Sequence, residues 1–156
     1  MHFTELAMSD MRWWTTKSCQ NIKPISHGNP DITISTDASL EGWGACQDGI
    51  EPSGSRWLTK EIAQCGHINC LELKGTKLGL LSLCEKEEHV LIHVQSDVTT
   101  ITIIMSGTHS MTCNKAARDI WLWCTKKKTW LKVTPIPGIQ NETADRLRPN
   151  FLDRTE

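Results

Sequence analysis

Four carboxylates stand in separate short motifs of the chain, and together they are suited to holding two divalent metal ions. They are Asp37 in STDAS, Glu72 in LEL, Asp97 in QSD and Asp145 in NETAD. Phosphodiester hydrolysis needs a more acidic attacking water and a neutralised leaving oxygen, and two magnesium ions roughly 3.5 to 4 Å apart supply both. Hard cations prefer oxygen ligands. Without such relief, four clustered carboxylates would repel one another and raise each other's pKa values.

Two of the four acids follow predicted β-strands. Over residues 31–37, Ile32 and Ile34 alternate with polar residues, so Asp37 continues the polar parity of a half-buried strand. Residues 89–95 alternate in the same way, and Asp97 continues the parity of the polar positions there. If these strands are neighbours, both aspartates leave the same edge of the sheet, where ligands of open α/β sheets bind.

Glu72 lies near the start of a helix predicted over residues 68–84. Gly75, Thr76 and Gly79 follow at spacings that place small side chains on the same helix face. One interpretation is that this face lets the helix approach the sheet closely and brings Glu72 towards the aspartates. The other is a poorly optimised helix, because each glycine costs about 1 kcal/mol relative to alanine. The sequence leaves both interpretations open.

Asp145 belongs to a predicted short helix at residues 141–147. It follows a turn at Pro137 and Gly138, and Asn141 is a suitable N-cap residue. This arrangement would place the Asp145 carboxylate about one helical turn in, beside Asn141.

The order of several short blocks resembles a known family. The blocks are Trp13-Trp14, TDAS at 36–39 with GWGA at 42–45, HIN at 67–69 with LEL at 71–73, Asp97, IWLW at 120–123, and PG at 137–138 with Asn141 and AD at 144–145. Together they resemble the ribonuclease H domain of retroelement reverse transcriptases, and most closely that of DIRS-type (tyrosine-recombinase) retrotransposons. Each block alone is weak, but the ordered set spans about residues 12–149.

The resemblance implies a role for each acid. Asp37 would bridge two metal ions, Asp145 would complete the site of the metal that activates water, and Glu72 with Asp97 would hold the metal beside the leaving group. The implied enzyme cuts the RNA strand of RNA/DNA hybrids and leaves 5′-phosphate and 3′-hydroxyl ends. Its cofactors would be two Mg²⁺ ions, with Mn²⁺ as a substitute, and its partner the reverse transcriptase domain of the same polyprotein.

The chain departs from the family pattern at three places. Pro135 stands where the family usually has a histidine, in the loop after the last strand, so we expect slower turnover. Val98 replaces a polar residue after Asp97, and the usual Leu-Ser-Arg ending reads Leu-Arg-Pro at 147–149. The alternative function is therefore a catalytically impaired or domesticated ribonuclease H-like domain that binds nucleic acid or a protein.

Contacts to nucleic acid must come from local groups, because the net charge is −1 and the pI is about 6.6. Basic residues gather between positions 115 and 132. We interpret Lys115 and Arg118 as phosphate contacts, and the lysines at 126–128 as a solvated helix end. Trp43 is more simply a core residue than a base-stacking platform. The predicted nucleic-acid contacts are Ser39, Asn69, Lys115, Arg118 and Asn141.

Composition indicates one intracellular domain, cytoplasmic or nuclear. The 156 residues are 38% hydrophobic and 22% charged, which suffices for a core. No apolar stretch is long enough to span a membrane, and no secretion signal is evident. Seven cysteines without a Cys-x-x-Cys pair indicate reduced thiols. Zinc binding by Cys65, His67 and Cys70 is disfavoured because a fourth ligand is not apparent.

The predicted fold is α/β and ribonuclease H-like, a mixed five-stranded sheet flanked by helices. Residues 1–30 are predicted to be an irregular and poorly ordered tether, and residues 31–156 the domain. Three strands at 31–37, 42–48 and 54–58 should form an antiparallel meander. Strands at 89–95 and 129–134 should add in parallel, because helices at 68–84, 98–105 and 112–127 precede or separate them.

Overall fold

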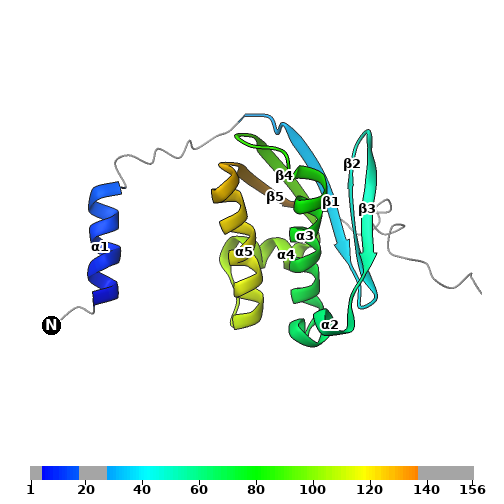
Figure 1. Ribbon diagram of the computed structural model, residues 1–156, viewed down its shortest axis with the longest axis horizontal. Coiled ribbons are helices and arrows are strands. Elements are labelled where there is room, and N and C mark those ends of the chain that lie inside the picture. Colours follow the sequence, from blue (N-terminus) through cyan, green and yellow to red (C-terminus); the bar gives the residue numbers. More distant parts are fainter. Residues whose placement is uncertain (1–4, 18–27, 137–156) are drawn as a thin grey trace, which may run out of the picture.

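The computed structural model describes residues 5–17 and 28–136, and it places a five-stranded sheet at the centre (Figure 1). The strands are β1 (Ile32–Ala38), β2 (Gly42–Gln47), β3 (Ile50–Arg56), β4 (Leu91–Ser96) and β5 (Trp130–Pro135). The helices are α1 (Glu5–Lys17), α2 (Thr59–Cys65), α3 (Ile68–Cys84), α4 (Val98–Ser106) and α5 (Met111–Lys127). The predicted element order from 31 to 136 is thereby confirmed, with one added helix.

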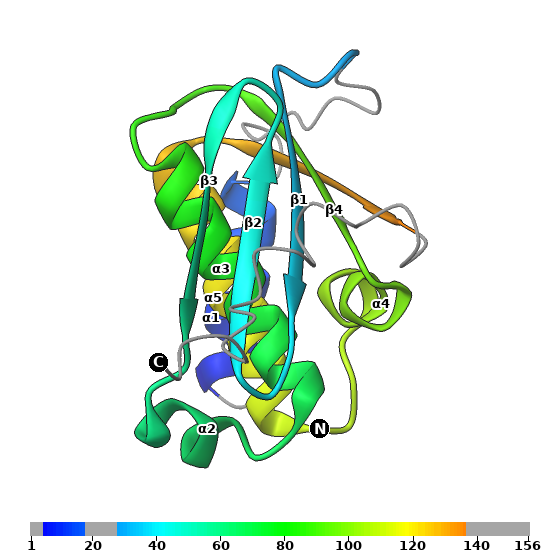
Figure 2. The same cartoon turned by 90° about the vertical axis from the view of Figure 1, so that its right-hand side faces the viewer.

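The sheet is mixed, with the strand order β3-β2-β1-β4-β5. β1, β2 and β3 form an antiparallel meander, whereas β4 pairs in parallel with both β1 and β5. Helices α3 and α5 cover one face of the sheet (Figure 1), and α4 lies beyond the carboxyl end of β4 (Figure 2). This arrangement confirms the predicted architecture of a meander extended by parallel strands.

Two local predictions in the first part of the domain were wrong. β3 begins at Ile50 rather than residue 54, because Gly49 has φ +76° and closes a tight Asp-Gly turn after β2. α2 was not predicted; it begins after Leu58, whose N–H donates to the Glu61 carboxylate of the first turn at 2.8 Å. The chain leaves α2 through Gly66 in the left-handed conformation.

The terminal segments were predicted as a tether and a final short helix. Residues 5–17 form α1, so the prediction of irregular chain is wrong for this stretch. The helix begins with residues of high helix propensity, and Glu5 in the first turn suits the helix dipole. The predicted helix at 141–147 lies outside the described residues, as do Asn141 and Asp145.

The glycine face of α3 packs directly on the sheet. A Cβ at position 79 would lie 2.8 Å from the Ala45 Cβ and 3.0 Å from the Thr36 Cγ2. One turn earlier, a Cβ at position 75 would lie 3.3 Å from the Ala38 Cβ. The interpretation of a close approach, rather than a poorly optimised helix, is therefore the correct one.

The core divides into two groups of apolar side chains. The larger group lies between the sheet and helices α3, α4 and α5, and the smaller one contains Trp43, Trp57 and Leu71. Trp43 is 6% exposed, which confirms it as a core residue. The six cysteines in the described part of the chain are all free thiols. Among the described helices, none combines the length and apolar character that crossing a membrane requires.

We expect Gly79→Ala to destabilise the fold by about 1 to 3 kcal/mol, the usual cost of overpacking a core, despite alanine's better helix propensity. The measurement is the free energy of unfolding in urea. Ser82→Ala, at an exposed position of the same helix, is the control and should change stability by less than about 0.5 kcal/mol. A Gly79→Ala protein as stable as the control would contradict the close packing of α3.

Candidate active site

Asp37 and Asp97 meet at the carboxyl ends of two neighbouring strands. β1 and β4 pair in parallel, with Thr33 opposite His93 and Ser35 opposite Gln95. The alternation of apolar and polar residues predicted from the sequence is therefore correct, and both aspartates lie at the same edge of the sheet. Asp37 is the sixth residue of β1, and Asp97 directly follows β4.

Glu72, in the second turn of α3, lies close to this edge of the sheet. The helix begins after His67, whose Nδ1 accepts from the Asn69 N–H at 3.2 Å. Burial raises the pKa of Glu72 to about 7, and the negative charge of Asp97, a hydrogen bond with Asp97 and the charge of Asp37 add to this rise. The three described acids are therefore close enough to interact, in agreement with one of the two interpretations that the sequence left open.

Asp97 is also the N-cap of α4. Its Oδ2 accepts from the Thr99 N–H at 2.9 Å, and its Oδ1 accepts from the Thr100 N–H at 3.0 Å. Two orphan donors at the start of the helix are thereby satisfied. These bonds hold the carboxylate in a defined orientation at the end of β4.

Buried hydroxyl groups join the elements that carry the acids, and the sequence analysis missed them. Thr36 on β1 shares a 3.0 Å hydrogen bond with Thr76 on α3, and Ser96 Oγ on β4 donates to the Thr36 carbonyl at 3.2 Å. Thr100 Oγ1 on α4 donates to Glu72 Oε2 at 3.0 Å. All four hydroxyl-bearing residues are at most 3% exposed. Their positions next to, or one turn from, the acids are the only sequence signal of this role.

The described acids fit a divalent cation in their chemistry. Each offers carboxylate oxygens, which Mg²⁺ and Mn²⁺ prefer, and a cation would relieve the repulsion at Glu72. Within residues 5–17 and 28–136, no group of three or more His, Cys, Asp or Glu side chains is arranged to hold a metal ion by itself. The fourth predicted ligand, Asp145, lies outside the described residues.

Two predicted nucleic-acid contacts lie beside the acids along the chain. Ser39 forms the turn after β1, where its Oγ accepts from the Glu41 and Gly42 N–H groups at 3.1 and 3.3 Å. Asn69 is half-buried in the first turn of α3, three residues before Glu72. The Ser39 hydroxyl thus has a structural role in the turn, and a contact of either residue with nucleic acid stays a prediction.

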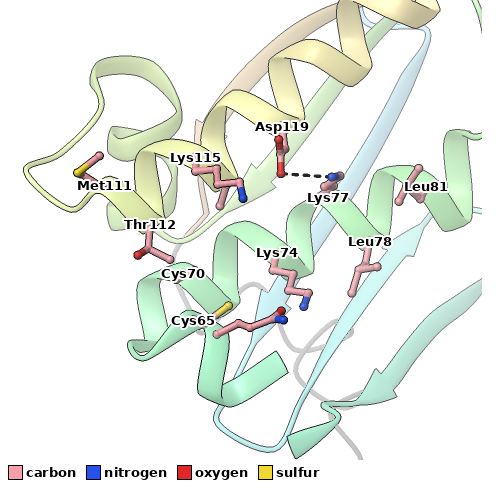
Figure 3. Close-up of a pocket in the computed structure, with 12 residues that line it drawn as sticks. Cys65, Cys70, Lys74, Lys77, Leu78, Leu81, Met111, Thr112, Lys115 and Asp119 are labelled. Atoms are coloured by element: carbon pink, nitrogen blue, oxygen red, sulfur yellow. Dashed lines mark ion pairs between the residues drawn. The ribbon is translucent and has the colours of Figure 1, made fainter. Parts of the chain in front are cut away.

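Lys115 and Arg118 lie in the first half of α5, a different element from those that carry the acids. Lys115 lines a cavity of about 760 Å³ between α3 and α5, together with Lys74 and Lys77 of α3 (Figure 3). Lys77 pairs with Asp119 at 3.6 Å in the same cavity, and Arg118 is exposed. The predicted phosphate contacts of Lys115 and Arg118 stay predictions, and Asn141 lies outside the described residues.

Pro135 is part of the sheet and not of the loop expected there. It is the last residue of β5, opposite Ser96, and the following Ile136 N–H donates to the Ser96 carbonyl at 2.8 Å. β5 is an edge strand, where proline is tolerated because its missing N–H breaks no ladder. Backbone hydrogen bonding thus fixes the chain through residue 136.

Comparison with solved structures identifies the fold. The chain resembles ribonuclease H1 from the archaeon Halobacterium salinarum with TM-score 0.54 and 16% identity, over 74% of this chain and 92% of that one. LC11-RNase H1, a compost metagenome protein solved with an RNA/DNA hybrid, matches with TM-score 0.58 and 16% identity, over 75% and 93%. The N-terminal RNase H domain of a Mycobacterium tuberculosis protein matches with TM-score 0.55 and 14% identity, over 77% and 91%.

No protein-family model matches the chain, and no curated protein matches its sequence. At 14 to 16% identity, the structural matches show the fold alone. The chain therefore has a ribonuclease H-like fold, as predicted from the sequence.

The raised pKa of Glu72 predicts how metal-free stability depends on pH. Because the folded value of about 7 exceeds the ordinary value of 4.5, the folded protein binds more protons between these values, and stability falls as pH rises through this window. The stability of Glu72→Gln should not show this fall. We expect a difference on the order of 1 kcal/mol, reduced by solvent screening. Urea unfolding of both proteins in a chelator, from pH 4 to 8, measures it; parallel curves would contradict the shift.

Proposed function

We propose that the chain is a metal-dependent endonuclease that hydrolyses the RNA strand of RNA/DNA hybrids. One observation carries this proposal: Asp37, Glu72 and Asp97, from three separate elements, meet at the carboxyl ends of β1 and β4. There the negative charges of both aspartates help to raise the pKa of Glu72. A half-buried carboxylate whose pKa is raised by burial and by neighbouring negative charge is unfavourable for folding, so this gathering of acids favours a functional site.

Asp37, Glu72, Asp97 and Asp145 are the proposed ligands of two Mg²⁺ ions, which Mn²⁺ could replace. When bound, such ions make the attacking water more acidic and neutralise the leaving oxygen. The protein's own contribution is orientation. Asp97 is held by two backbone N–H groups and Glu72 by the Thr100 hydroxyl, so two of the four carboxylates are fixed before substrate arrives.

The proposed context is reverse transcription of a retrotransposon, most similar to the DIRS type. The ordered sequence blocks support this proposal, and the fold supports its ribonuclease H part. LC11-RNase H1 was solved in complex with an RNA/DNA hybrid, the substrate proposed for this chain. The partner would be the reverse transcriptase domain of the same polyprotein, acting in the cytoplasm or nucleus.

A non-catalytic nucleic-acid or protein binding domain is the second candidate. Both carboxylate oxygens of Asp97 already accept hydrogen bonds from α4, and Pro135 supplies no titratable group at the end of β5. Such a domain would keep the fold and bind its partner without cutting. A cleavage assay separates the two candidates.

We expect the protein to cut the RNA of a labelled RNA/DNA hybrid in Mg²⁺ or Mn²⁺ and to leave single-stranded RNA intact. Asp37→Asn should lower the rate roughly 100-fold or more, since a lost metal ligand removes several kcal/mol of transition-state stabilisation. Asp48→Asn, at the exposed turn between β2 and β3, is the matched control and should cut normally. Absence of cutting by folded protein in both metals would contradict the enzyme and favour the binding domain.

The proposed phosphate contacts on α5 predict a change in salt dependence. Replacing Lys115 and Arg118 with alanine should weaken hybrid binding and lower the slope of log affinity against log salt by about 1 to 2, because fewer counterions are released. Lys126 and Lys128, exposed at the other end of α5, provide the double-alanine control. Equal slopes for the two double variants in a fluorescence anisotropy titration would contradict the assignment.

A further inference from the structure

Thr100 directs its hydroxyl to another helix rather than to its own backbone. A threonine inside a helix commonly bonds the carbonyl four residues earlier, as Thr102 does with the Val98 carbonyl at 2.8 Å. For Thr100 the corresponding carbonyl is that of Ser96, which accepts the Ile136 N–H. The Thr100 hydroxyl instead crosses from α4 to α3 and donates to Glu72 Oε2 at 3.0 Å.

The same residue also contacts a second acid. The backbone N–H of Thr100 donates to Asp97 Oδ1 at 3.0 Å, and its side chain is completely buried. Asp97 and Glu72 are therefore held by two groups of one residue, although they come from different elements. A buried side chain with both bonds made has little freedom to reorient, so the relative placement of the two carboxylates is fixed in the absence of metal.

We infer that Thr100 is a positioning residue that holds Glu72 ready to bind a divalent cation together with Asp97. This inference rests on the proposed function, since it assigns a role within the same site. The Thr100 hydroxyl donates to Oε2 of Glu72, so this bond leaves the second carboxylate oxygen, Oε1, for another ligand. Loss of the hydroxyl would let the carboxylate rotate and would weaken cation binding more than it weakens hybrid binding.

The test compares hydroxyl-bearing and hydroxyl-free residues of similar shape at position 100. Thr100→Val keeps the branched shape and removes the hydroxyl, whereas Thr100→Ser keeps the hydroxyl. Thr102→Val removes a hydroxyl that bonds only within α4, so it is the matched control. Calorimetry with Mn²⁺ on the full chain without hybrid measures cation binding, and steady-state cleavage gives kcat and KM for the hybrid.

We expect Thr100→Val to weaken Mn²⁺ binding about tenfold, the size of one hydrogen bond to a charged group. At limiting Mn²⁺ its kcat should fall while KM for the hybrid stays within about twofold. Thr100→Ser and Thr102→Val should resemble the wild type in both measurements. If Thr100→Val does not fold, Thr100→Ala, which has no branched methyl groups to accommodate, takes its place in the same comparison.

Normal Mn²⁺ binding by a folded hydroxyl-free variant would overturn the inference while leaving the nuclease intact. Equal weakening in Thr100→Ser and Thr100→Val would also overturn it, because packing and not the hydroxyl would then be responsible. A wild-type protein that neither binds Mn²⁺ nor cuts the hybrid would instead refute the proposed function, and the positioning role with it.

Discussion

The close approach of α3 to β1 and β2 is the constraint on which the candidate site depends. Gly79 leaves no room for a Cβ between helix and sheet and Gly75 leaves little, so the helix axis comes near enough for Thr76 to reach Thr36. That contact fixes the distance between α3 and β1 at a point one helical turn after Glu72. A helix with ordinary side chains on this face would stand farther from the sheet and would carry Glu72 away from Asp37 and Asp97.

The site concentrates negative charge where solvent only partly relieves it. Burial and the neighbouring aspartates together raise the pKa of Glu72 to about 7. Hydrogen-bond donors surround the acids: two backbone N–H groups of the first turn of α4 bond Asp97, and the Thr100 hydroxyl bonds Glu72. Oriented donors beside negative charge support the proposed cation site.

Much of the fold could be predicted because local patterns and global topology agree. The alternation in β1 and β4 correctly placed Asp37 and Asp97 on one edge, whereas the glycine spacing in α3 left close packing and a poorly optimised helix both open until the structure decided for close packing. The sequence did not predict α1 or α2, which lack a clear apolar period. Nor could it predict the Thr36–Thr76 and Thr100–Glu72 bonds, because they join residues 40 and 28 positions apart that only tertiary packing brings together.

The central claim is that three acids from separate elements contribute to one proposed cation site, and nuclear magnetic resonance of the ¹⁵N-labelled protein tests it most directly. Titration with Mg²⁺ should shift amide signals around Asp37, Glu72 and Asp97 together over the same range of Mg²⁺ concentration. Shifts at one of these positions alone, or none at any of them, would contradict the claim that the fold gathers these carboxylates for metal-dependent chemistry.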